Sequence, residues 1–275
     1  QADTSYTNIT ACDSVVWNGT TYDSSGTYSY SSGGSNNYSM SFDGNIDFIS
    51  INTTNFNDID DFSVCFWLQT NSSSYSRLIN KDCVNCPEGE WKVDMQGSNN
   101  GKILFEIEPG NGGASSSLNS ITSVNDGNYH FIVCSRNNQT GETKLYVDGQ
   151  LEDSDTSNNN IYNITNNYPL YFGGIFSGND YYLGLLDNIH IWDIPLTQQE
   201  IQQYMSCPPT GTETGLVGYW NFETGSGNTA YDQTLNGNDG TINGATYDIN
   251  VPSQSCNLTN SNGCDSTAIL NLTIN

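Results

Sequence analysis

The chain has 275 residues, with 30 Asp and Glu against six Lys and Arg, so its formal net charge is -24. A nucleic-acid backbone or an anionic lipid surface would repel such a chain, because binding to either depends on basic side chains that release counterions. No apolar run approaches the roughly 18 residues needed to span a bilayer. We therefore exclude nucleic acid as a partner and exclude membrane insertion. The 17 Tyr, 10 Phe and five Trp supply side chains for a large core, which a disordered acidic tail would lack.

The carboxylates have few cationic partners in the sequence. Residues 1–76 and 145–275 contain no Lys or Arg at all. Self-repulsion must then be relieved by solvent, by salt or by bound divalent cations. Calcium is the natural candidate, because it is a hard cation that prefers oxygen ligands.

Eight cysteines in a chain rich in Asn, Ser, Thr and Gly indicate an oxidising environment, and hence an extracellular or cell-surface location. An even number fits a set of disulfides, but about 105 complete pairings are open. Cys83 and Cys86 form a C-x-x-C motif that could be a redox motif or half of a zinc site. No second C-x-x-C and only two His are present to complete a zinc site. A local disulfide in a loop is therefore favoured.

In chain order, the predicted elements are almost all short strands that mix β-branched and aromatic residues between turn-forming residues. They cover residues 62–70, 102–108, 129–135, 144–147, 170–173, 188–192 and 215–222. Many short strands with turn signals between them predict a sandwich or a barrel. One helix is predicted from Thr197, which forms a capping box with Glu200, to about Met205.

Five motifs occur in one order along the chain. They are Ser41-Phe42-Asp43-Gly44 and the segments 62–68, 126–133, 144–149 and 186–192. In sequence and spacing they resemble the laminin-G-like, concanavalin A-like jelly roll, and the resemblance covers about residues 35–252. It implies an all-β sandwich. Tyr129 departs from the pattern, since the family usually has Trp there. Cys65 and Cys134 also depart, because the resemblance puts them on near-neighbour strands; we include both among the disulfide candidates.

The segment 215–252 resembles the strands that open many domains of this family, yet here it comes last. It either completes the same sandwich in permuted order or belongs to a following copy that the chain lacks. We favour completion, because so aromatic a segment would otherwise be left exposed.

The two ends of the chain resemble halves of a short repeat found in secreted bacterial surface proteins. We therefore expect residues 1–34 and 256–275 to form one small β module into which the sandwich, residues 35–255, is inserted. Each half contains a Cys-Asp-Ser tripeptide, which suggests a disulfide between Cys12 and Cys264. A second one, between Cys207 and Cys256, would bracket the segment 215–252.

Catalysis is not favoured by the sequence. Glycosidases on similar folds place carboxylates on one strand face, but neither Glu106 with Glu108 nor Glu90 with Asp94 has the acidic E-x-D-x-x-E spacing of that family. The two histidines lie within predicted strands without a nucleophile motif nearby. We therefore expect no enzymatic activity.

Two kinds of binding site are candidates. The resemblance implies a calcium ion at the sandwich rim, and the oxygen donors that it suggests are Asp43, Asp187, Asp232, Asn238 and Asp239. The alternative is that these residues only form turns. A sugar site would need exposed aromatic side chains, which Trp91, Tyr181 and Tyr182 could supply, although aromatics in strands more often belong to the core.

Two functions remain open on these grounds. The first is a non-catalytic structural or adhesion module of a bacterial surface protein or fibre, which associates with itself or with neighbouring repeats by β-strand addition through its terminal segments. The second is a calcium-dependent, lectin-like module that binds glycans through its rim loops.

Overall fold

The computed structural model describes residues 3–274, apart from 13, 18–19, 31–35, 53, 58, 83–88, 98–100, 111–114, 157–161, 165, 176–178, 255–257 and 260–264. The chain divides into two compact units. The larger unit comprises residues 36–205 and 209–253, and the smaller comprises residues 1–35, 206–208 and 254–275. Each unit is described by itself.

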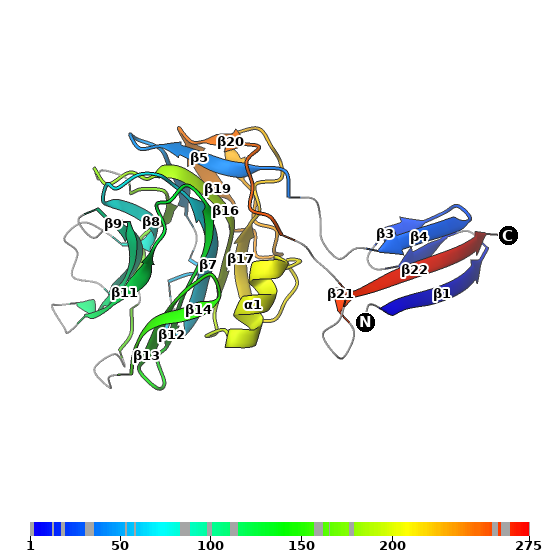
Figure 1. The fold of residues 1–275 in the computed structure, drawn as a ribbon, viewed down its shortest axis with the longest axis horizontal. Helices are drawn as coiled ribbons and strands as arrows, with labels where there is room; N and C mark the ends of the chain where they lie inside the picture. The colour runs from blue at the N-terminus through cyan, green and yellow to red at the C-terminus, as the bar shows by residue number, and fades with distance from the viewer. Residues whose placement is uncertain are drawn as a thin grey trace. The chain divides into compact units, whose positions relative to one another are not determined.

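The larger unit is a sandwich of two eight-stranded sheets (Figure 1), in which every strand pair is antiparallel. The first sheet has the order β14 (Gln150–Asp155), β13 (Glu142–Val147), β12 (Tyr129–Asn137), β7 (Phe62–Gln69), β16 (Leu183–Trp192), β5 (Ser39–Asp43) and β20 (Thr246–Asp248), with β17 (Leu216–Trp220) also paired to β16. The second has the order β11 (Ser116–Ser123), β10 (Lys102–Glu108), β9 (Glu90–Gln96), β8 (Ser76–Lys81), β15 (Leu170–Phe172), β6 (Phe48–Ile51), β19 (Gly240–Asn243) and β18 (Thr229–Ala230). The predicted all-β jelly-roll sandwich is confirmed.

The main core lies between the two sheets, because one face of each strand carries the large apolar side chains. In β10, Ile103, Phe105 and Ile107 are buried and alternate with half-buried residues. This period-2 pattern is what a strand with one covered face requires. Burial of the core side chains is the main favourable contribution to folding.

The central strand β7 is buried on both faces. Phe62, Val64, Phe66 and Leu68 belong to the main core, whereas Cys65 and Trp67 belong to a second, smaller core. The second core is covered by helix α1 (Gln198–Ser206), which contributes Ile201 and Tyr204. The predicted helix is confirmed to within one residue at its end.

The last strands of the chain lie inside the sandwich. Strand β17 pairs with β16, β19 pairs with β6, and β20 pairs with β5, so this segment extends both sheets. Trp220 is buried, packs against the ring of Phe172 at 5.0 Å between centroids, and donates its indole N–H to the carbonyl of Asn238.

The smaller unit has a sheet of its own. Strand β1 (Asp3–Ala11) pairs in parallel with β22 (Asp265–Ile274), and β4 (Gly26–Tyr30) and β21 (Leu258–Thr259) pair antiparallel with β22. A hairpin of β2 (Val15–Trp17) and β3 (Thr20–Tyr22) forms a separate two-stranded sheet. Strands from the beginning and the end of the chain therefore share one sheet. In the part of the chain that the structure describes, we find no helix with the length and apolar character of a membrane span.

Two expected disulfides are wrong. Cys65 and Cys134 have free thiols, and they point to opposite faces of the first sheet, Cys134 into the main core and Cys65 into the second core. Cys12 is also a free, exposed thiol. It follows Ala11, which pairs with Ile274, and so it lies at the end of β22 that is far from Asp265. Its expected partner, Cys264, lies outside the described residues.

The other cysteines are only partly described. Cys207 is disulfide-bonded. Its expected partner Cys256, and the expected Cys83–Cys86 pair, fall outside the described residues.

Candidate functional site

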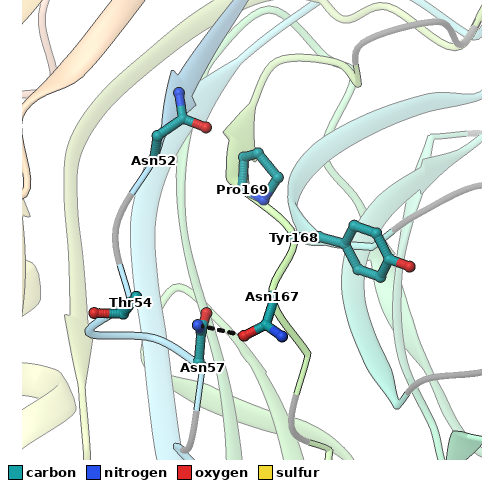
Figure 2. Close-up of a pocket in the computed structure, with 6 residues that line it drawn as sticks. All are labelled: Asn52, Thr54, Asn57, Asn167, Tyr168 and Pro169. Carbon is teal, nitrogen blue, oxygen red and sulfur yellow. Dashed lines mark hydrogen bonds between the residues drawn. The ribbon is translucent and has the colours of Figure 1, made fainter.

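A cavity of about 640 Å³ opens where two loops meet at the end of a strand pair (Figure 2). Because Ile51 pairs with Leu170, the residues just beyond them, Asn52 and Pro169, come together. We call this cavity the amide pocket, since three of its lining side chains are asparagines. Its described lining consists of Asn52, Thr54, Asn57, Asn167, Tyr168 and Pro169.

A buried lysine organises the two loops around the amide pocket. Lys81 is only 1% exposed, and its ammonium group donates to Asn57 Oδ1 at 3.0 Å and to the carbonyls of Asn166 and Tyr168 at 3.1 and 2.7 Å. A buried ammonium needs such acceptors to offset the loss of its hydration. The 52–57 loop and the 166–168 loop are thereby fixed to the same strand, β8.

The ammonium of Lys81 also fixes which way the pocket amides face. Because Asn57 Oδ1 accepts from Lys81, the amide nitrogen of Asn57 must be its other end, and it donates to Asn167 Oδ1 at 2.9 Å. The dashed line in Figure 2 marks this bond. Both amide oxygens are therefore used within the protein, and the amide nitrogen of Asn167 remains available to the pocket.

Hydrogen bonds of Asn166 also fix the 166–168 loop. Asn166 is buried, its amide nitrogen donates to the carbonyl of Gly89 at 2.6 Å, and its Oδ1 accepts from the backbone N–H of Tyr168 at 3.1 Å. A Cβ atom at Gly89 would lie 2.6 Å from the Cα of Ile164, so no larger residue fits there. The pocket wall is thus rigidly supported.

A second cavity, of about 570 Å³, lies where β7 ends and β16 begins. We call it the rim cavity; it is lined by Gln69, Thr70, Asn71, Ser72, Gly127, Leu183, Gly184, Leu185 and Asn250. Asn250 donates to Gln69 Oε1 at 2.5 Å, and Gln69 Nε2 donates to the carbonyl of Gly127 at 2.8 Å. This cavity has amide side chains in its lining as well, beside the apolar side chains of Leu183 and Leu185.

The predicted calcium ligands Asp232, Asn238 and Asp239 form a closed turn. The carboxylate of Asp232 accepts four hydrogen bonds, from the backbone of Tyr219, Thr234 and Asn238 and from the hydroxyl of Thr234. Asp239 accepts from the backbone N–H of Asp232 at 2.9 Å. In this structure, these oxygens stabilise the loop, as Asx-type turns do.

The other two predicted ligands lie apart from that turn and from each other. Asp43 is exposed, and hydrogen bonds from the side chain and backbone of Asn45 hold its pKa below the usual range. Asp187 is fully buried, and burial raises its pKa to about 8. The predicted set of five is therefore not gathered into one site, and the described residues contain no group of three or more His, Cys, Asp or Glu that could hold a metal.

Asp187 has an environment of its own on the outer face of the first sheet. It lies opposite Trp67 and accepts hydrogen bonds from Asn36 Nδ2 at 2.8 Å and from the backbone N–H of Asn188 at 2.7 Å. The negative charge of Glu223 contributes to the raised pKa of Asp187. Glu223 also accepts a hydrogen bond from the backbone N–H of Asn37 at 2.9 Å. Asn36 Oδ1 is buried and has no hydrogen-bond partner among the described residues.

The expected aromatic platform is not formed. Trp91 is 4% exposed and stacks on Phe62 in the main core, and Tyr182 is fully buried, with its hydroxyl donating to the carbonyl of Gln69. Tyr181 is half-buried against the cluster of Phe48, Tyr171 and Ile175. Trp91 is buried because it lies on the covered face of β9 (Glu90–Gln96), whereas Tyr181 and Tyr182 lie just before β16 and pack inward from there.

The carboxylates considered for catalysis are engaged with other groups. Lys92 Nζ lies 2.9 Å from Glu106 and 3.4 Å from Glu108. Asp94 is buried, accepts from the hydroxyl of Tyr75 at 2.5 Å, and has a pKa raised to about 6 by burial. His190 is buried, which lowers its pKa to about 3, and it accepts from the indole of Trp192.

A two-sheet jelly roll is the architecture of many lectin domains, and ligand sites are typically concave with a few placed polar groups. Residues 42–202 match the laminin-G-like family described as the concanavalin A-like lectin/glucanases superfamily. This match covers more than half of the chain, and the chain belongs to that family.

Two solved structures share the fold. A candidate carbohydrate-binding protein from Bacteroides ovatus aligns with a TM-score of 0.63 at 16% identity, over 80% of this chain and 62% of that one. The heptameric SAP-like pentraxin of Limulus polyphemus aligns with a TM-score of 0.58 at 13% identity, over 81% of this chain and 98% of that one. This chain thus spans less than two thirds of the Bacteroides protein. No curated protein matches the sequence.

Proposed function

We propose that the chain is a non-catalytic glycan-binding module and that the amide pocket is its binding site. The observation that carries this proposal is the orientation of the Asn57 and Asn167 side-chain amides. The hydrogen bond from Lys81 to Asn57 Oδ1 fixes it, together with the bond from Asn57 Nδ2 to Asn167 Oδ1. The Bacteroides protein with the same fold is itself a candidate carbohydrate-binding protein, which agrees with this assignment.

The chemistry of the amide pocket suits a sugar. Sugar hydroxyls form hydrogen bonds with neutral amides without the desolvation of a charge, and the ring of Pro169 offers an apolar surface beside Asn52 (Figure 2). A volume of about 640 Å³ is large enough for a disaccharide. Because the loops are already fixed, little ordering entropy is lost when a ligand binds.

A pair of matched variants tests this site. A glycan array first identifies a ligand, and calorimetry then measures its affinity for the wild type, Asn167→Ala and Asn71→Ala. Asn167 lines the amide pocket, whereas Asn71 lines the rim cavity. We expect a loss of about tenfold or more for Asn167→Ala, which corresponds to about 1.4 kcal/mol, and none for Asn71→Ala. The reverse result would move the site to the rim cavity.

We also propose a calcium ion beside Asp187. Support comes from Asp187 and Glu223, whose negative charges act on each other, and from the buried, unpartnered Oδ1 of Asn36, which are the kinds of oxygen ligand that calcium prefers. When bound, calcium would neutralise a buried carboxylate and fix the backbone at residues 36–38.

Thermal unfolding with calcium and with a chelator tests the calcium proposal. Calcium should raise the Tm of the wild type and of Asp239→Asn, but not that of Asp187→Asn. An equal response of all three proteins would contradict a site at Asp187.

A second role, in assembly at the cell surface, rests on strand β1. This strand lies at the edge of the terminal sheet, where it pairs only with β22 among the described residues, and edge strands accept further strands. The disulfide at Cys207 agrees with an extracellular location.

Light scattering on the complete chain tests the assembly role. We expect concentration-dependent oligomers, which Tyr6→Lys on β1 should reduce. Tyr231→Lys is the matched control, because Tyr231 is also exposed but lies in the sandwich. A strictly monomeric wild type would contradict the proposal.

A further inference from the structure

We infer that the amide pocket selects sugars that carry an N-acetyl group. This inference rests on the proposed glycan binding and names the class of sugar that the same site prefers.

The hydrogen bonds within the amide pocket leave donors, and not acceptors, facing a ligand. The oxygens of Asn57 and Asn167 are both used within the protein, by the Lys81 ammonium and by the Asn57 amide nitrogen. The N–H groups of Asn167 have no partner among the described residues, and the Asn57 nitrogen has a second hydrogen beyond the one given to Asn167. Two neighbouring amides therefore present donors to the same cavity.

A carbonyl oxygen is the ligand atom that suits these two donors best. A carbonyl oxygen has two lone pairs and no hydrogen of its own, so it can accept from both amides at once. A sugar hydroxyl is a donor as well as an acceptor, and its hydrogen finds no acceptor at these two side chains. An acetamido group supplies the carbonyl.

A carboxylate is also an acceptor, but it suits this protein less well than an acetamido group does. The chain carries a net charge of -24, which repels anionic ligands. An acetamido group is neutral, and its methyl group needs an apolar contact. The ring of Pro169 lies on the pocket wall, whereas the ring of Tyr168 points away from the other labelled side chains (Figure 2).

The experiment uses matched glycans that differ only at C2 of the sugar ring, such as cellobiose and N,N′-diacetylchitobiose, with the deacetylated, cationic disaccharide as a third ligand. Calorimetry of the complete chain measures each affinity at low and at high salt. We expect the acetylated member of each pair to bind at least about tenfold more tightly, with little dependence on salt.

Asn167→Asp tests the role of the amide hydrogens directly. The carboxylate keeps an oxygen for the Asn57 nitrogen, so the loop contact survives while the two N–H donors are lost. The preference for the acetylated sugar should disappear. Asn71→Asp, which makes the same change in the rim cavity, should keep that preference.

The outcomes separate this inference from the proposed function. Equal binding of acetylated and unacetylated partners would overturn the inference but leave glycan binding intact. Tighter binding of the cationic sugar, lost at high salt, would show charge attraction instead and would also overturn it. Failure of every glycan on an array to bind would overturn the proposed function itself.

Discussion

Lys81 links the fold to the candidate site at the level of a single residue. Its side chain is buried, and its ammonium group donates hydrogen bonds to both loops of the amide pocket. The sequence shows Lys81 as one of only six basic residues, but nothing in its neighbours predicts that it is buried. Its role depends on acceptors at residues 57, 166 and 168, which lie far away in the sequence.

Lys81→Met should destabilise the protein by about 2–4 kcal/mol, because it leaves buried acceptors without a donor. It should also abolish glycan binding, since Asn57 loses its fixed direction. Urea unfolding and calorimetry measure the two effects. Lys102→Met on β10 is the control and should change stability by less than about 0.5 kcal/mol. Unchanged stability of Lys81→Met would contradict the structural role of the lysine.

His130 should make the stability of the protein depend on pH. Its ring nitrogens lie 2.8 Å from Asp148 and 3.2 Å from Asp126, and the hydrogen bond to Asp148 is the main cause that raises its pKa above the usual value. A histidine whose pKa is raised by folding stabilises the protein below its unfolded pKa of about 6.5, and this contribution is lost as the pH rises through the folded pKa.

The stability difference between the wild type and His130→Gln should therefore be largest near pH 5.5, about 1 kcal/mol, and should shrink toward pH 8.5. Urea titrations at several pH values measure it. A difference that grows with pH would show that the histidine is not held as the cation.

Helix α1 shows how one element completes the sandwich. Thr197 and Glu200 cap it reciprocally: the Thr197 N–H donates to Glu200 Oε2 at 2.8 Å, and the Glu200 N–H donates to Thr197 Oγ1 at 3.3 Å. Ile201 and Tyr204 then cover the second core. The two capping residues are only three positions apart in the sequence, which is why the helix could be predicted from local signals alone.

Ile201→Ala should cost about 2–4 kcal/mol, because it removes a fully buried side chain from a packed core. Gln203→Ala on the exposed side of the same helix should cost less than about 0.5 kcal/mol. Chemical denaturation measures both variants. Similar losses for the two would mean that α1 does not cover the second core as described.

The strands could be predicted from the sequence more easily than the amide pocket that lies at the end of two of them. Every strand expected from β-branched and aromatic runs overlaps an observed strand, because that signal lies within a few consecutive residues. The amide pocket instead depends on the pairing of Ile51 with Leu170, which brings together loops more than 100 residues apart in sequence. Its asparagines stand among many others, so composition does not single them out.

At the scale of the whole molecule, the resemblance of five motifs predicted the family correctly, whereas site residues transferred from it did not form one site. Family motifs mark strands and turns that build the fold, and Asp232, Asn238 and Asp239 are such turn residues here. Trp91 and Tyr182 were candidates for a sugar platform, with the core as the alternative, and the packed sandwich buries both. Burial is a property of the assembled sandwich that a single sequence does not reveal.

The net charge of -24 also acts on the whole molecule. Repulsion among surface carboxylates destabilises the compact state, and salt screens it. The Tm should therefore rise when NaCl is increased from about 10 mM to about 150 mM, over which the Debye length falls from roughly 30 Å to roughly 8 Å. Scanning calorimetry measures the shift. A Tm that falls with salt would mean that ion pairs, and not repulsion, dominate.

Glycan binding by the wild type, compared with Asn167→Ala and Asn71→Ala, is the most direct test of the proposed site. Circular dichroism and thermal unfolding should first show that both variants keep the fold. We predict that the wild type and Asn71→Ala bind the same glycan with equal affinity and that Asn167→Ala binds it at least about tenfold more weakly. Equal affinity of all three proteins, or no binding by the wild type, would contradict a glycan site in the amide pocket.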